Sequence, residues 1–244
     1  MTHALPMFAA LAAALSLTAC QKAEDAAFGA KVHAYLMAHP EVLREAEVKL
    51  QENDRIAAQK ASTDAIAKYR GQLERDSRDF VANPGGKITV VEFFDYRCGY
   101  CKLAAPQVVE LIQQNPDVRF VFKEFPIFGE VSDTAAKVAL TRAAKTKGME
   151  LYQTLMADKA LNDESLDRHL AELGIDPVQA RKDAGHPQID RQILDVHTLA
   201  VALHIDGTPA FIVGDTMVPG ADMPALKAAI AKARGATGPA TTKS

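Results

Sequence analysis

Two cysteines three residues apart, Cys98 and Cys101, are the residues of this chain whose types and spacing most clearly suggest chemistry. They follow an apolar, strand-like run that ends at Phe94 and a short polar turn, and they open a segment of helical character. A cysteine at a helix N-terminus faces unpaired backbone N–H groups and the positive end of the helix dipole, and both favour the thiolate. The second sulfur, one turn on, lies close enough to close a disulfide. The pattern predicts thiol–disulfide exchange, in which an attacking sulfur has its own resolving partner.

Two other interpretations of this pair are weaker, and a third stays open. Half of a zinc site would need two further Cys or His ligands at matching spacing, and the sequence has no second Cys-x-x-Cys and no closely paired histidines. A structural disulfide between residues three apart would stabilise little, because the loop that it closes is short. Two soft thiolates also suit Cu(I), so copper binding by Cys98 and Cys101 remains an alternative. We expect no resident metal and no cofactor.

The segments around the cysteines predict an α/β domain. Residues 88–94 and 118–122 are apolar, strand-like runs, and an amphipathic helix over residues 102–114 joins them. This order of strand, helix and strand places the cysteines at the carboxyl end of the first strand. Open α/β sheets carry their chemistry at that end.

The remainder of the domain continues this organisation. A block of helices without a strand signal is predicted over about 130–204, and strands follow at 207–213 and 216–218 before a last helix. We therefore expect an α/β, thioredoxin-like fold with an inserted helical domain, spanning residues 83–235. The Gly-, Thr-, Ala- and Pro-rich residues 236–244 predict a disordered tail.

The N-terminus has the pattern of an export signal. Residues 7–17 form an apolar run that is too short to span a bilayer but suits a secretory signal peptide at residues 1–19. Leu17-Thr18-Ala19-Cys20 resembles the lipobox of bacterial lipoproteins, in which Cys20 would carry the lipid. The first seven residues contain no Lys or Arg, and ordinary cleavage after Ala19 is the alternative. Export would place the protein in the periplasm, an oxidising compartment with disulfide substrates.

Residues 20–82 predict a charged helical arm. Pro40 interrupts its pattern and suits the start of a second helix. Apolar residues recur seven apart in two rows, which are Leu36, Leu43, Leu50 and Ala57, and Ile66, Leu73 and Phe80. Between them lie mostly charged residues, so the apolar surface is narrow. Such a helix either pairs with a copy of itself, giving a homo-oligomer, or packs on its own domain, and the pattern favours neither.

The charge of the chain argues against one class of partner. Lys and Arg number 28 against 31 Asp and Glu, which gives a net charge of −3. A protein that binds nucleic acid normally carries a strong basic bias. We expect no nucleic-acid partner.

The residues around the cysteines resemble a known family. The run Phe94-Asp95-Tyr96-Arg97-Cys98-Gly99-Tyr100-Cys101-Lys102, with Thr208-Pro209 far along the chain, is similar to the DsbA-type thioredoxin-fold thiol:disulfide oxidoreductases. Within them it is most similar to the ScsC-like and Com1-like exported proteins. The resemblance implies that Cys98 is an exposed nucleophile and Cys101 the resolving cysteine. It further implies that Pro209 is a cis-proline packed against the disulfide, and that Thr208 presents backbone groups to an extended substrate.

The resemblance also draws attention to two charged residues in apolar strands, Glu92 and Lys123. A lone buried charge is costly, so each must be paired or face solvent. In the family an acid and a lysine lie beneath the active site. Glu92 and Lys123 are therefore expected to tune or transfer the proton of Cys101, although solvated edge positions remain the alternative.

The direction of the reaction stays open between oxidase, reductase and isomerase. Gly99-Tyr100 between the cysteines and Thr208 before the expected cis-proline resemble isomerase and reductase members more than dedicated oxidases. We expect disulfide isomerisation or reduction, with oxidation as the alternative. The expected partners are unfolded or misoxidised exported proteins and a membrane redox partner of the DsbD or DsbB type.

Overall fold

The computed structural model describes residues 27–237 of the chain. The predicted signal peptide, Cys20 and residues 238–244 of the predicted tail lie outside the described residues. The chain divides into two units, Met1–Gln59 and Lys60–Ser244.

The first unit is helical in most of its described part. Residues 27–38 form one helix, and helix α2 (Glu41–Glu74) begins directly after Pro40, as the sequence predicts, and continues beyond this unit. Large apolar side chains of the unit are exposed in the single chain; they are Phe28, Val32, Tyr35, Met37, Leu43, Val48, Leu50 and Ile56. The first unit therefore presents apolar surface that its described residues do not bury.

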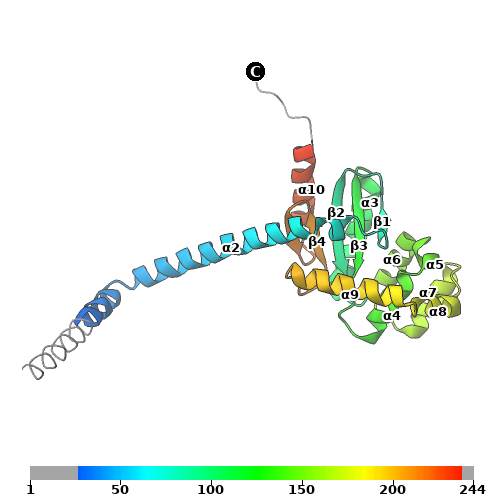
Figure 1. Cartoon of the computed structure of the whole chain (residues 1–244), viewed down its shortest axis with the longest axis horizontal. Coiled ribbons are helices and arrows are strands. Elements are labelled where there is room, and N and C mark those ends of the chain that lie inside the picture. The colour runs from blue at the N-terminus through cyan, green and yellow to red at the C-terminus, as the bar shows by residue number, and fades with distance from the viewer. Residues whose placement is uncertain (1–26, 238–244) are drawn as a thin grey trace, which may run out of the picture. The chain divides into compact units, whose positions relative to one another are not determined.

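The second unit is built on a five-stranded mixed sheet (Figure 1). The strands are β1 (Phe80–Ala82), β2 (Ile88–Phe94), β3 (Val118–Glu124), β4 (Ala210–Val213) and β5 (Thr216–Pro219). Their order is β1-β3-β2-β4-β5, with β2 and β3 parallel and every other pair antiparallel. The central strand β2 is apolar except for Thr89 and Glu92, which is the pattern of a strand covered on both faces.

Helices cover both faces of this sheet. Successive side chains of a strand point to opposite faces, so the apolar strand residues divide between two cores. One core lies under α3 (Gly99–Gln114) and α10 (Met223–Thr237), and the other lies under α9 (Pro187–Ala202) and the end of α2. In that last segment Ile66 and Leu73 are fully buried, so this part of the predicted arm packs on its own domain.

The predicted helical arm over residues 20–82 is wrong at its C-terminal end. Helix α2 ends at Glu74, and β1 pairs in antiparallel register with β3, with Phe80 opposite Phe122. The Asp76 side chain accepts hydrogen bonds from the backbone and guanidinium of Arg78 and stabilises the intervening turn. A strand of three residues is too short to show an alternating pattern, so the seven-residue spacing of Phe80 was misleading.

Six helices lie between β3 and β4, over the span where the sequence predicts a helical insertion. In addition to α9 they are α4 (Glu130–Ala139), α5 (Arg142–Lys145), α6 (Gly148–Ala157), α7 (Asp163–Glu172) and α8 (Pro177–Ala184). Their starts are encoded locally: Asn162 forms a capping box with Ser165, and Pro177 and Pro187 stand in first turns. The first residue of α6, Gly148, has to be a glycine, because a Cβ at this position would lie 2.3 Å from the Phe80 ring.

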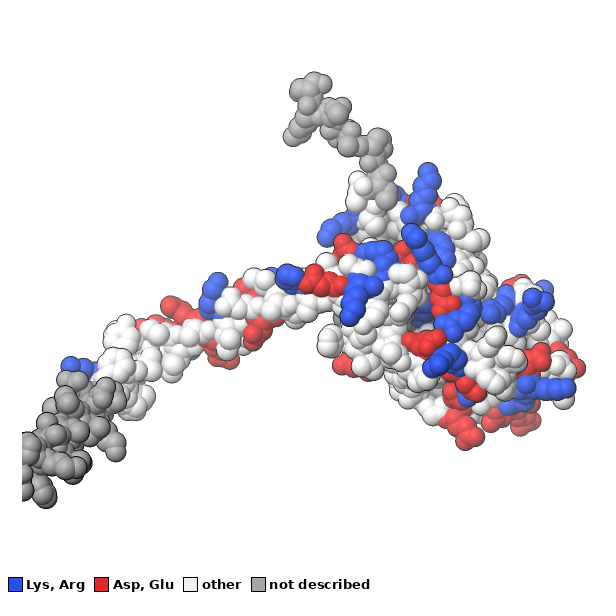
Figure 2. All heavy atoms as spheres, in the orientation of Figure 1, with Lys and Arg blue, Asp and Glu red and all other residues white. Residues whose placement is uncertain are grey.

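Charges of both signs are mixed over the face of the second unit that Figure 2 presents. Lys and Arg side chains alternate there with Asp and Glu, and ion pairs such as Arg181 with Asp163 and Lys137 with Asp190 join neighbouring helices. Within residues 27–237, none of the helices combines the length and the hydropathy that a membrane span requires.

Candidate active site

The two cysteines lie where β2 passes into α3. Cys98 is the N-cap of α3, and its Sγ accepts a hydrogen bond from the Cys101 backbone N–H at 3.4 Å. The Cys98 thiol also donates to the Thr208 carbonyl at 3.1 Å, and the Thr208–Pro209 peptide bond is cis, as expected. The fold therefore brings together the two predicted halves of the site, which are more than a hundred residues apart.

Cys98 is less accessible than the resemblance implies. Only 2% of its surface is exposed, because the Thr208 carbonyl and the first turn of α3 lie against the sulfur. The neighbouring Tyr100 is instead 66% exposed.

The structure separates the pKa values of the two thiols. Hydrogen bonds from the Cys101 thiol and from the N–H groups at the start of α3 lower the pKa of Cys98 to about 6, against the cost of burial. Cys101 is fully buried, and burial together with its hydrogen bond to Cys98 raises its pKa far above the usual range. At neutral pH Cys98 is the thiolate and Cys101 keeps its proton.

Glu92 lies in the buried middle of β2, on the same core as Cys101. The Tyr152 hydroxyl is 3.1 and 3.3 Å from its two carboxyl oxygens. Burial raises the pKa of Glu92 to about 8, although the bond from Tyr152 opposes this. When Glu92 is ionised, its negative charge contributes to the raised pKa of Cys101.

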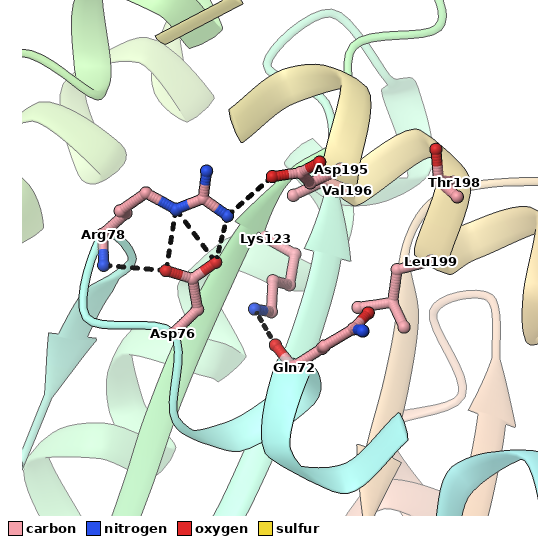
Figure 3. Close-up of a pocket in the computed structure, with 8 residues that line it drawn as sticks. All are labelled: Gln72, Asp76, Arg78, Lys123, Asp195, Val196, Thr198 and Leu199. Carbon is pink, nitrogen blue, oxygen red and sulfur yellow. Dashed lines mark hydrogen bonds and ion pairs between the residues drawn. The ribbon is translucent and has the colours of Figure 1, made fainter. Parts of the chain in front are cut away.

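Lys123 does not lie beneath the cysteines. Glu92 pairs in register with Phe122, so the next residue of β3 points to the opposite face of the sheet. There the Lys123 ammonium donates to the Gln72 carbonyl at 2.6 Å (Figure 3). It also forms a buried ion pair with Asp79. The expectation that Lys123 tunes Cys101 is therefore wrong, and this lysine holds the C-terminal end of α2.

The charges around Lys123 compensate one another. Figure 3 shows the Arg78 guanidinium between the carboxylates of Asp76 and Asp195, which it bonds at 2.6 and 2.9 Å. These side chains line a pocket of about 340 Å³ between the end of α2 and α9. The pocket lies on the face of the sheet opposite Cys101, and its paired charges tie α2 and α9 to the sheet.

The sequence analysis missed a second buried carboxyl on the cysteine face, Glu124. Its Oε1 accepts a hydrogen bond from the Tyr96 hydroxyl at 3.0 Å, and burial raises its pKa well above the usual range. Glu124 follows Lys123 and has the same parity along β3 as Phe122. Strand alternation therefore held the signal that could have placed it on this face.

Asp95, directly after β2, was also missed. Its carboxylate accepts hydrogen bonds from the Arg97 N–H at 2.6 Å, the Ile127 N–H at 2.7 Å, the Phe128 N–H at 3.1 Å and the Ser132 hydroxyl at 2.8 Å. It thus joins the cysteine turn to the loop after β3. Sequence alone gave no signal, because its donors lie more than thirty residues away in three of four cases.

Comparison with known proteins agrees with this geometry. Residues 89–231 match the family model described as the DSBA-like thioredoxin domain. The chain belongs to this family. Residues 24–57 also match the model of the copper resistance protein ScsC N-terminal domain.

Solved structures of similar proteins cover both units of this DSBA-like protein. BcfH of Salmonella enterica Typhimurium is 33% identical with a TM-score of 0.72, and the match covers 90% of this chain and 100% of BcfH. ScsC of Proteus mirabilis in a transitional conformation is 26% identical with a TM-score of 0.63, covering 89% and 99% of the two chains.

Curated relatives are longer than the matched region. The thiol:disulfide interchange protein DsbA of Bordetella pertussis is 28% identical over 53% of this chain and 64% of its own length. Na(+)/H(+) antiporter NhaA 3 of Salinispora tropica matches at 29% identity over 56% of this chain, but over only 22% of the antiporter. The chain thus spans less than two thirds of these relatives.

Proposed function

We propose that this DSBA-like protein is an exported thiol:disulfide oxidoreductase that acts on protein disulfides through Cys98 and Cys101. One observation carries the proposal: the Cys98 sulfur caps the start of α3, where it accepts the Cys101 N–H and has its pKa lowered to about 6. A thiolate at neutral pH with a protonated thiol directly behind it is the arrangement that exchange requires.

The reaction follows from the two pKa values. The Cys98 thiolate attacks one sulfur of a substrate disulfide, the substrate S–S bond breaks, and the other substrate sulfur leaves as a thiolate. Cys101 then attacks Cys98, the mixed disulfide breaks, and the second substrate sulfur leaves with its electron pair. Glu92 has a pKa of about 8, so it is mostly protonated at neutral pH, and its ionised fraction accepts the Cys101 proton. The substrate is reduced as the two cysteines are oxidised, and the reverse sequence oxidises a dithiol.

The backbone beside the cysteines suits an extended substrate. Thr208 and Pro209 precede β4, and the Thr208 carbonyl already lies against Cys98. An extended chain can pair with such a segment through main-chain hydrogen bonds. Thr208 and Pro209 are therefore assigned to substrate positioning.

The residues between and beside the cysteines favour reduction or isomerisation over oxidation. Gly99-Tyr100 between the cysteines and Thr208 before the cis-proline resemble isomerase and reductase members more than dedicated oxidases. We therefore assign the protein to isomerases or reductases, with a DsbA-like oxidase as the alternative.

The N-terminal region completes the proposal. The signal-like residues 1–19 support export to the periplasm, and lipidation of Cys20 would attach the chain to a membrane facing it. The exposed apolar residues of the arm, such as Leu43 and Leu50, support self-association into a homo-oligomer. A membrane protein of the DsbD or DsbB type would restore the redox state of the cysteines.

Two assays test the enzyme function. We expect the wild type to reduce insulin and to refold scrambled ribonuclease. The Cys98→Ser variant should show neither activity, because the attacking sulfur is lost. Copper binding is the competing function, since two thiolates suit Cu(I). Inactivity of the wild type in both assays, together with tight Cu(I) binding that Cys98→Ser removes, would favour the copper function.

A further inference from the structure

Asp95 joins the active-site turn to a loop that carries two exposed apolar side chains. The loop covers residues 125–129, between β3 and α4, and presents Ile127 (37% exposed) and Phe128 (47% exposed). Asp95 itself is only 2% exposed. Nothing in the proposed exchange reaction uses this residue.

The two carboxylate oxygens of Asp95 accept hydrogen bonds from different segments of the chain. Oδ2 accepts the backbone N–H groups of Ile127 and Phe128, and Oδ1 accepts the Arg97 N–H and the Ser132 hydroxyl. All four groups donate to Asp95, and a carboxylate suits this position because both of its oxygens are acceptors. Hydrogen bonds to a charged group are the stronger kind, and four of them on one buried carboxylate make a rigid junction.

The backbone of Asp95 also touches the cysteine turn. Its carbonyl accepts the Cys98 N–H at 3.1 Å, and a backbone hydrogen bond from Asp95 lowers the pKa of Cys101. From the other side, the Arg97 guanidinium donates to the Phe128 carbonyl at 2.9 Å. The loop with Ile127 and Phe128 is therefore fixed relative to Cys98 by bonds in both directions.

We propose that Asp95 is a positioning residue that holds Ile127 and Phe128 beside Cys98 as a contact surface for apolar side chains next to a substrate cysteine. This inference rests on the proposed function, because it concerns which protein disulfides react. A polypeptide joined to Cys98 must run past the segments bonded to the cysteine turn. Because this apolar loop is held at a fixed distance from Cys98, disulfides in unfolded segments, which expose apolar side chains, should react faster than small polar disulfides.

The test compares three disulfide substrates with the full-length protein. They are oxidised glutathione, a peptide disulfide with Leu and Phe flanking the cysteine, and the same peptide with Ser in their place. Asp95→Asn keeps the size of the side chain but replaces one acceptor oxygen by a donor, so the loop loses its anchor. We expect kcat/KM for the apolar peptide to fall on the order of tenfold, mainly through KM. The rate with glutathione is expected to stay within about twofold.

Further variants keep the proposal testable if Asp95→Asn fails to fold. Ser132→Ala removes one of the four donors and should give a smaller loss in the same direction. Phe128→Ser removes the apolar contact itself and should remove the preference for the apolar peptide over the Ser peptide. Asp133→Asn, an adjacent carboxylate that pairs with Lys137, is the matched control and should behave as wild type.

The outcomes separate this inference from the proposed function. An equal fall in the rates of all three substrates with Asp95→Asn would mean that Asp95 acts on the cysteines, and the inference would be overturned. If Asp95→Asn does not fold, the same result with Ser132→Ala and Phe128→Ser has the same meaning. Unchanged rates with an active wild type overturn it as well. A wild type that reacts with glutathione but with neither peptide contradicts the proposed function, and the inference fails with it.

Discussion

The Cys98 thiolate depends on a donor that also performs the second chemical step. The first contribution to its lowered pKa is the hydrogen bond from the Cys101 thiol. In the proposed exchange, the residue that resolves the mixed disulfide therefore also lowers the pKa of the attacking sulfur. Removing Cys101 affects both steps, and the two effects need separate measurements.

Alkylation of Cys98 by iodoacetamide separates them. In Cys101→Ser, whose hydroxyl still donates, the alkylation rate should rise with pH and reach half its maximum near pH 6. In Cys101→Ala the midpoint should move upward towards the usual cysteine range by about 1 pH unit or more, because the first donor is absent. Equal midpoints for the two variants would show that the N–H groups at the start of α3 alone lower the pKa of Cys98.

Glu92 makes stability fall as pH rises. Its pKa is raised from 4.5 to about 8, so between these values the folded protein binds a proton that the unfolded chain has lost. Across this window Glu92 alone should lower the free energy of unfolding by about 1.4 kcal/mol per pH unit. The raised pKa values of Asp79 and Glu124 add to this decrease. Urea unfolding of the reduced protein at several pH values measures this slope.

Glu92→Gln isolates this contribution. Glutamine keeps an acceptor for the Tyr152 hydroxyl but cannot ionise, so the variant should have a smaller slope than wild type and exceed it in stability at pH 8. The slope that remains belongs to the other buried acids, such as Glu124. Glu150→Gln, an exposed position on α6, serves as the control and should keep the slope of the wild type. A wild-type stability that is flat between pH 5 and pH 8 would contradict the raised pKa of Glu92.

Sequence predicts single residues unevenly. Cys98, Cys101 and Pro209 could be placed because their chemistry is carried by local spacing or by a resemblance to known motifs. Lys123 could not, since a lysine in a strand can face either side, and only the register of β2 and β3 decides this. Asp95 and Glu124 stand next to predicted positions, but their partners come from distant segments, so their roles appear only in three dimensions.

At the scale of elements, the end of α2 is fixed by charge as well as by apolar contact. Lys123 and Asp79 are each about 1% exposed, and Gln192 donates to the same carboxylate at 3.1 Å. A second cation, Arg119, donates to the Glu74 carbonyl at 2.8 Å. Both positive side chains thus bond the terminal carbonyls of the helix, where the dipole is negative.

Breaking this ion pair should destabilise the domain without changing Cys98. Lys123→Met leaves a buried carboxylate without its cation, and the free energy of unfolding should fall by about 3–5 kcal/mol. Asp79→Asn combined with Lys123→Met removes the stranded charge and should recover part of that loss. Urea unfolding measures both, and the alkylation midpoint of Cys98 should stay near pH 6 in the folded protein. A shifted midpoint would restore a catalytic role for Lys123.

The strands and helices themselves were largely predictable. Apolar runs with clear turns marked β2, β3 and the β4–β5 hairpin, and Gly and Pro marked many helix ends. Strand β1 could not be predicted, because it has only three residues and Phe80 continues the seven-residue spacing of apolar residues in the preceding helix. Its partner β3 defines it, and a partner cannot be read from a local pattern.

At the scale of the whole molecule, the position of the unit boundary decides how the arm should be removed. A chain that begins at Lys60 keeps Ile66 and Leu73, which are buried in the domain. This chain should be monomeric by light scattering, and the full chain oligomeric, if the arm pairs with copies of itself. We expect the shorter chain to lose isomerase activity while Cys98 remains reactive, because isomerisation would use paired active sites.

Point variants give the matched control. Leu43→Lys with Leu50→Lys places charges on exposed positions of the arm and should dissociate the oligomer without unfolding the domain. Lys49→Arg should leave the mass unchanged. An equal mass for the full chain and the chain from Lys60 would end the oligomer hypothesis. A chain that begins after Arg78 should fold poorly, since it lacks the buried end of α2.

The two edges of the sheet have a consequence for a protein that handles unfolded chains. β1 and β5 are the outer strands, with only three and four residues, and β5 ends at Pro219, which has no N–H to donate. Long, flat outer strands recruit other extended chains and seed aggregates. Under the proposed function, an unfolded substrate held beside Thr208 would find little unpaired backbone on which to extend this sheet. The short edge strands would then let the protein bind aggregation-prone polypeptides and still release them.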